Sequence, residues 1–167
     1  SKQRPVCFES MVEVKKGIKE FSNSMKPVLL LGETGTGKES IAQTIHAQSR
    51  KGDRPFIKLN CLFRQKQAIQ SQLFKRKDNK TQSTSGEKVV YLSNIESLSK
   101  GLQEKLAEAL QNTNLPDTSF EFLPIRLFAS SSKNLDELAA KGQFHQSLLD
   151  AFKDTSLLIP PLRNQTA

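Results

Sequence analysis

The sequence predicts an α/β domain built around a parallel β-sheet of five strands. Short apolar runs alternate with segments of helical periodicity, and this alternation is typical of βαβ units. The run Val89–Leu92 is apolar throughout, as expected for a central parallel strand that is buried on both faces. A glycine-rich turn separates the first strand signal from the next helix. We therefore expect one domain over residues 1–167, with the sheet sandwiched by helices.

The first part of the chain contains an opening helix, two strands and the helix between them. Four apolar residues at helical spacing define one face of the opening helix: Met11, Val14, Ile18 and Phe21. The first strand, Val28–Leu31, ends at Gly32. The second helix covers residues 38–49, and the second strand is Phe56–Asn60.

A polar and basic segment, residues 75–88, precedes the third strand, and we expect it to be a loop. The third strand is Val89–Leu92. Three leucines at helical spacing mark the helix after it: Leu102, Leu106 and Leu110. Ile125–Ala129 is the fourth strand.

The last part of the chain adds one short helix and one strand. Asn134 followed by Glu137 resembles a capping arrangement, and Gly142 is placed to end the helix that it starts. Ser156–Ile159 is the fifth strand, which Pro160 and Pro161 terminate.

The composition is typical of one globular domain. The chain has 167 residues, of which 36% are hydrophobic and 25% charged, so extended disorder is not expected. No apolar run has the length of a membrane span, and no signal peptide is recognisable. Two cysteines and no Cys/His cluster predict neither a disulfide framework nor a metal site. These features favour a cytoplasmic protein without a membrane partner.

The formal net charge is +8, and much of it is local. Residues 64–80 contain six basic side chains and one acidic side chain. A solvated loop explains such a segment most simply. A binding patch for a polyanion, either nucleic acid or a second nucleotide, is the alternative.

A phosphate-binding loop lies between the first strand and the second helix. It comprises Gly32, Glu33, Thr34, Gly35, Thr36, Gly37, Lys38 and Glu39. The glycines allow successive backbone N–H groups to surround a phosphate, and the helix N-terminus adds partial positive charge. Lys38 supplies a cation for the outer phosphates, whereas Glu39 stands where most such loops have a magnesium-binding Ser or Thr. The loop therefore predicts binding of ATP or ADP, with Mg²⁺ weak or absent, and does not by itself predict cleavage.

With these residues, the chain resembles the central AAA+ domain of bacterial enhancer-binding activators of sigma-54 RNA polymerase, the NtrC type. The matching segments cover nearly the whole chain: Gly32–Glu39, Ile41–His46, Pro55–Cys61, Ser71–Phe74, Leu102–Leu106 with Leu110 and Gln111, and Pro160–Arg163. The resemblance implies a P-loop NTPase α/β subdomain that self-associates through its AAA+ faces. It also implies a longer regulator, whose helical lid, sensing region and DNA-binding region lie outside this fragment. In that regulator, RNA polymerase and promoter DNA are contacted through regions outside this fragment.

Several positions depart from the pattern of that family. Ser93 and Asn94 stand where its Walker B strand carries Asp and Glu, and Ser131 and Ser132 stand at the sensor position. His145 occupies the first arginine-finger position, and Ala151 the second. Because the acids hold magnesium and activate water, the resemblance implies a degenerate member with very weak or no ATPase activity. We therefore assign no catalytic residue and no metal ligand.

The interval from Leu73 to Ser93 also differs, since it is only 20 residues long. The family places its sigma-contacting loop of glycine and phenylalanine here, and the interval is about ten residues too short to hold it. Lysine-rich sequence fills the interval instead. This difference implies a regulator that does not remodel sigma-54.

Three functions remain open at the level of sequence. The first is a nucleotide-binding regulatory and oligomerisation domain without turnover. The second is an active ATPase with displaced acids, for which Glu96 or Glu87 could serve, although both are more simply surface charges. The third is a domain that binds cyclic di-GMP or nucleic acid through arginines: Arg50, Arg54, Arg64, Arg76, Arg126 and Arg163. Arg126 is more simply part of a strand edge, His46 a helix-surface residue and Tyr91 a core residue.

Overall fold

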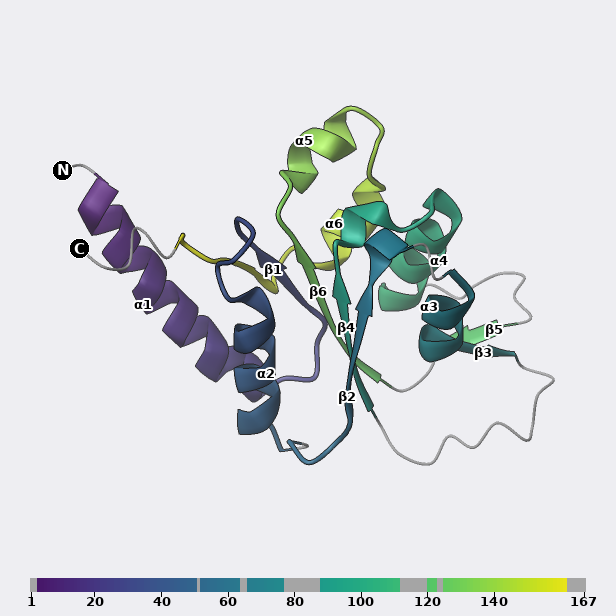
Figure 1. The fold of residues 1–167 in the computed structure, drawn as a ribbon, viewed down its shortest axis with the longest axis horizontal. Helices are drawn as coiled ribbons and strands as arrows, with labels where there is room; N and C mark the ends of the chain where they lie inside the picture. The colour runs from purple at the N-terminus through teal and green to yellow at the C-terminus, as the bar shows by residue number, and fades with distance from the viewer. Residues whose placement is uncertain are drawn as a thin grey trace.

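The computed structural model describes residues 3–50, 52–63, 66–76, 88–111, 120–122 and 125–161. Its main sheet has five parallel strands in the order β2-β4-β6-β1-β7 (Figure 1). These strands are β1 (Val28–Leu31), β2 (Phe56–Asn60), β4 (Lys88–Ser93), β6 (Ile125–Ser131) and β7 (Ser156–Leu158). The predicted five-stranded parallel sheet is therefore confirmed.

Helices cover both faces of this sheet (Figure 1). On one face lie α1 (Gln3–Ser22) and α2 (Lys38–Gln48), and on the other α3 (Lys66–Leu73), α4 (Lys100–Leu110) and α6 (Gln146–Ala151). The short helix α5 (Leu135–Ala140) follows β6 beyond the upper edge of the sheet in Figure 1. None of the helices in the described part of the chain is long and apolar enough to span a membrane.

Alternation along the strands divides the apolar side chains between two cores. Leu29, Leu92 and Ala129 pack with α3, α4 and α6 on one face. Leu30 and Phe128 pack with α1 and α2 on the other face. Both faces of the central strands are thus buried, as the apolar third strand predicted.

The predicted cap of the short helix is confirmed. The Asn134 side chain accepts a hydrogen bond from the backbone N–H of Glu137 at 3.1 Å, and α5 begins at the next residue, Leu135. Gly142 follows the helix with a φ of 73°, the left-handed conformation of many helix ends. Ser99 caps α4 in the same way, by accepting from the N–H of Leu102.

The expected loop over residues 75–88 is wrong at both ends. Lys75 and Arg76 belong to β3 (Phe74–Arg76), which pairs antiparallel with β5 (Phe120–Phe122), and Lys88 begins β4. The rings of Phe74 and Phe122 meet edge to face, with centroids 5.5 Å apart. Residues 77–87, which include Glu87 and most of the expected basic loop, lie outside the described residues, as do Arg64 and Arg163.

The expectation that His46 lies on a helix surface is also wrong. Its side chain is 6% exposed, its Nε2 lies 2.8 Å from the Arg54 carbonyl oxygen, and its ring packs on Phe56. Strand β2 and the turn before it cover this side of α2. His46, which lies next to the apolar face of the helix, is therefore buried by tertiary packing. Tyr91 is buried, as expected.

Arg126 lies at the start of the central strand β6 and is 1% exposed, so it cannot clamp a ligand at the surface. Its Nη2 donates to the Phe21 carbonyl oxygen at 2.6 Å, and its guanidinium lies over the Phe128 ring. Burial lowers the pKa of Arg126 to about 10. The side chain therefore ties the end of α1 to the sheet.

We expect Arg126→Ala to lower the free energy of unfolding by about 2–4 kcal/mol, because it leaves a cavity and removes the bond to Phe21. Arg126→Met keeps most of the volume without a buried charge and should cost about 1 kcal/mol or less. Urea unfolding followed by circular dichroism measures both, with the exposed Arg50→Ala as control. Equal losses for the two variants would contradict this account.

Candidate nucleotide-binding site

The turn from β1 to α2 has a conformation that requires glycine. Gly35 and Gly37 have φ values of 84° and 87°, in the left-handed region that L side chains rarely adopt. A Cβ at either position would meet no atom within 4 Å, so conformation and not crowding explains both glycines. Gly37 is the N-cap of α2 and no side chain caps this end, which leaves its first-turn N–H groups directed at the loop.

Lys38 begins α2 and extends back over the loop. Its Nζ donates to the carbonyl oxygens of Gly32 at 2.6 Å and Glu33 at 2.9 Å. Burial lowers the pKa of Lys38, and the negative charge of Glu96 acts in the opposite direction. The loop thus combines backbone N–H groups with a positioned ammonium, which is the chemistry that binds a phosphate.

A pocket of about 290 Å³ lies between this loop and the carboxyl ends of β4 and β6. Its lining joins residues from three places in the sequence: Thr34, Gly35, Gly37, Lys38, Glu39, Tyr91, Ser93, Asn94, Ser130, Ser131 and Ser132. Parallel strands bring their carboxyl ends to one edge of the sheet, and ligands of open α/β sheets bind there. The Walker B and sensor positions named from the sequence therefore face the same pocket as Lys38.

The two residues at the end of β4 offer no carboxylate to this pocket. Asn94 has a left-handed backbone, with φ 55° and ψ 51°, which Asn tolerates better than most residues. Its Nδ2 donates to Asn60 Oδ1 at 2.9 Å. Ser93 Oγ lies 3.5 Å from the Leu59 carbonyl oxygen. Neither side chain is a base that could accept a proton from water near neutral pH.

A residue at the end of β6, Ser131, binds the side chain of Glu96, which sequence reasoning had assigned to the surface. Glu96 lies in the 3₁₀ turn η2 (Ile95–Ser97) and is half-buried, and its Oε1 accepts a hydrogen bond from Ser131 Oγ at 2.6 Å. Ser131 is buried and Ser132 exposed. The sequence offered one signal for Glu96: it closely follows β4, whose carboxyl end lines this pocket.

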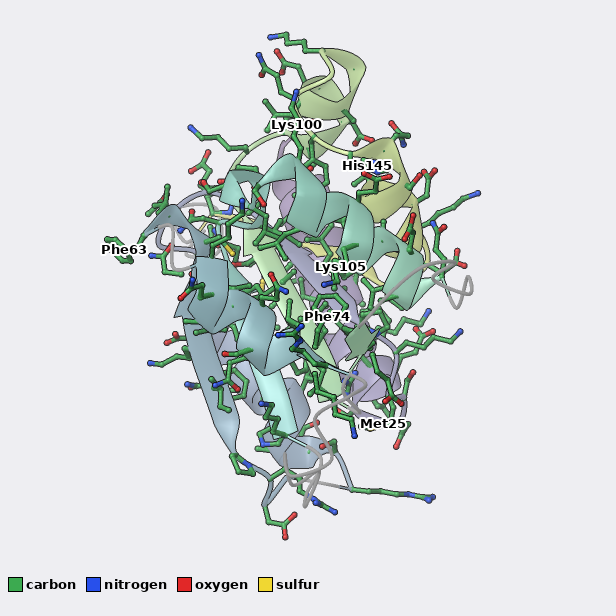
Figure 2. The ribbon with its side chains drawn as sticks, turned by 90° about the vertical axis from the view of Figure 1, so that its right-hand side faces the viewer. Met25, Phe63, Phe74, Lys100, Lys105 and His145 are labelled. Atoms are coloured by element: carbon green, nitrogen blue, oxygen red, sulfur yellow. The ribbon has the colours of Figure 1, made fainter. Side chains whose placement is uncertain are left out.

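His145 and Ala151 lie away from this pocket. His145 is the N-cap of α6, and its backbone N–H donates to Gln103 Oε1 at 2.8 Å. It borders a separate cavity of about 360 Å³ with Lys100 on α4, and Figure 2 shows both residues toward the same end of the molecule. Ala151 is half-buried at the end of α6.

The residues of the pocket fit nucleotide phosphates better than a protein-held magnesium ion. Among the described residues, no group of three or more His, Cys, Asp or Glu side chains is placed to hold a metal. Glu39, which follows Lys38, lies within 3.5 Å of Lys58 Nζ instead. Magnesium prefers carboxylates together with phosphates in octahedral geometry. Neither Ser93 nor Asn94 supplies a carboxylate.

A glycine loop with its lysine, at the carboxyl edge of a parallel sheet of this strand order, is the arrangement of the AAA+ P-loop fold. The family model described as the Sigma-54 interaction domain matches residues 7–157. The chain belongs to this family.

Curated relatives of this chain include Nif-specific regulatory proteins. That of Rhodobacter capsulatus is 31% identical over 169 residues, which cover 93% of this chain and 29% of the relative. That of Herbaspirillum seropedicae is 31% identical over 170 residues, covering 94% of this chain and 31% of the relative. The chain thus spans about three-tenths of the length of the curated relatives that it matches.

Solved structures share the fold. NtrX from Brucella abortus in complex with ATP matches with a TM-score of 0.70 and 22% identity, over 90% of this chain and 37% of that one. The P-loop NTPase domain of a sigma-54 transport activator from E. coli matches with a TM-score of 0.64 and 22% identity, over 92% and 96%.

Proposed function

We propose that this chain is a nucleotide-binding regulatory and oligomerisation domain of a bacterial transcription regulator, with impaired hydrolysis. The observation that carries the proposal is a complete phosphate loop facing Ser93 and Asn94 in one pocket. The loop has its glycine conformations and its positioned Lys38. The two residues at the end of the opposite strand, Ser93 and Asn94, supply no acid to activate water.

Hydrolysis of a bound triphosphate requires three tasks: coordination of magnesium, activation of water and neutralisation of charge in the transition state. Ser93 and Asn94 lack the carboxylates for the first two tasks. His145 and Ala151 lack the guanidinium that the family brings to the third. The pocket therefore supports binding of ATP or ADP without efficient turnover, and Mg²⁺ contributes weakly.

We place this domain within a longer cytoplasmic regulator, in agreement with the share of the curated relatives that it spans. In that protein the domain self-associates through its AAA+ faces, while RNA polymerase and promoter DNA are contacted by regions outside these residues. Such a regulator acts on promoters without remodelling sigma-54.

Calorimetric titration of this chain with ATP, ADP and cyclic di-GMP tests the proposal. We expect measurable binding of at least one of the first two, and phosphate release at the background rate from both this chain and the full-length protein. Steady phosphate release from the full-length protein would favour the active ATPase instead. Binding of cyclic di-GMP alone would favour a cyclic dinucleotide receptor.

A further inference from the structure

The carboxylate of Glu96 is held directly behind the pocket, by a hydrogen bond to one of its lining residues, Ser131. Ser131, 1% exposed at the end of β6, donates its hydroxyl proton to Glu96 Oε1 at 2.6 Å. The same hydroxyl accepts from the backbone N–H of Lys133 at 3.0 Å. Ser131 is therefore fixed from two sides, and it holds the carboxylate in one place behind the lining of the pocket.

A phosphate chain bound at the loop is expected to extend toward the strand ends that hold this carboxylate. The backbone N–H groups of such a loop take the inner phosphates, and the lysine reaches the outer ones. The wall opposite Lys38 is formed by the strand ends, with Ser93 and Ser131 among the lining residues. The terminal phosphate of a triphosphate therefore comes nearer to Glu96 than the two phosphates of a diphosphate.

The pocket lining has too little positive charge to neutralise a third phosphate. Of the described residues that line it, Lys38 alone is basic, and the Glu39 carboxylate at the rim is paired with Lys58 at 3.5 Å. The charge of Glu96 reaches the loop: burial lowers the pKa of Lys38, and the negative charge of Glu96 opposes that shift. Each further negative charge on the ligand thus meets a fixed like charge without a second cation from these residues.

Building on the proposed nucleotide-binding function, we infer that Glu96, positioned by Ser131, makes the pocket prefer a nucleoside diphosphate to a triphosphate. Repulsion between the Glu96 carboxylate and the third phosphate, partly shielded by water, weakens triphosphate binding about five- to fiftyfold. The preference decreases with ionic strength, because salt screens an interaction across a partly open pocket. The domain would then report the ratio of ADP to ATP without consuming either.

Calorimetry with ADP and with ATP tests this inference, each in EDTA and in Mg²⁺, on the wild type and on Glu96→Gln. We expect the wild type to bind ADP about tenfold more tightly than ATP in EDTA. Glu96→Gln keeps an acceptor for Ser131 and should raise ATP affinity toward that of ADP, while ADP affinity changes less than twofold. Glu13→Gln, which removes an exposed carboxylate on α1, should leave the ratio unchanged.

Ser131→Ala provides a second variant, since it releases Glu96 from its position without removing the charge. We expect it to reduce the preference for ADP partially. Equal affinities of the wild type for ADP and ATP would overturn the inference and leave the proposed function standing, whereas absence of binding to either would overturn both. Tighter ATP binding in Mg²⁺ that Glu96→Gln abolishes would show that Glu96 serves a metal ion, which also overturns the inference.

Discussion

Lys38→Ala is expected to weaken binding of ADP and ATP at least about a hundredfold, since each charge-assisted bond to phosphate contributes about 1.5–3 kcal/mol. The substitution removes the basic side chain of the described pocket lining. It also removes the two bonds from Nζ to the carbonyl oxygens of Gly32 and Glu33, so the loop loses an internal support. Calorimetry on the purified chain measures the effect.

Two further variants make the interpretation specific. Lys141→Ala removes an exposed lysine paired with Glu137 on α5 and should leave affinity unchanged. Lys38→Arg keeps the charge, but a planar guanidinium cannot replace the ammonium between the same two carbonyl groups, so we expect an intermediate affinity. Unchanged affinity of Lys38→Ala would show that the nucleotide binds elsewhere.

The combined substitution Ser93→Asp and Asn94→Glu is expected to leave ATP turnover at least about a thousandfold below that of an AAA+ protein with its arginine finger, because a finger alone accounts for 10³ or more. The two changes supply acids at the end of β4, while His145 and Ala151 remain. We also expect no sigma-54-dependent open complex from either the wild type or the variant.

The geometry of β4 adds a second reason. Asn94 has a left-handed backbone, and a glutamate there costs roughly 1 kcal/mol. The change also removes the bond from Asn94 to Asn60. The two new acids therefore replace a local structure that is fitted to Asn94, which disfavours the arrangement that hydrolysis requires.

Two measurements test impaired hydrolysis: phosphate release and open-complex formation, each with the full-length wild type and the double variant. Thermal unfolding of the variant must remain cooperative, so that loss of structure is not mistaken for lack of activity. Robust turnover by the wild type, or open-complex formation by either protein, would refute impaired hydrolysis.

The main sheet could be predicted from local sequence, because each strand carries its own signals. The predicted bounds of β1 and β2 agree with the structure, since a short apolar run ends at a glycine or begins after a proline. The pair β3 and β5 was missed: each has three residues, and their pairing depends on contact between distant segments. Helices α3 and α6, of eight and six residues, were missed because such short segments show little periodicity.

The candidate site divides in the same way. The loop Gly32–Glu39 was visible because its chemistry lies in consecutive residues. The position of Glu96 depends on a bond to Ser131 from another strand, and the burial of His46 depends on β2, so neither follows from local pattern. The structure places Ser93, Asn94, Ser131 and Ser132 around one pocket, while their functional roles stay predictions.

The strand order described above has a consequence for how the protein is made. Within the part of the chain that the structure describes, β1, which leads into the glycine loop, pairs with β6 and β7, and both strands are synthesised long after it. At typical rates of translation, roughly 6 to 25 seconds separate residue 28 from residue 156 on the ribosome. During that time the apolar segment Val28–Leu31 has no strand partner on its β7 side, so this edge of the nascent chain stays unpaired and open to chaperones. The glycine loop is thus synthesised early, whereas the strand ends that complete its pocket are synthesised late.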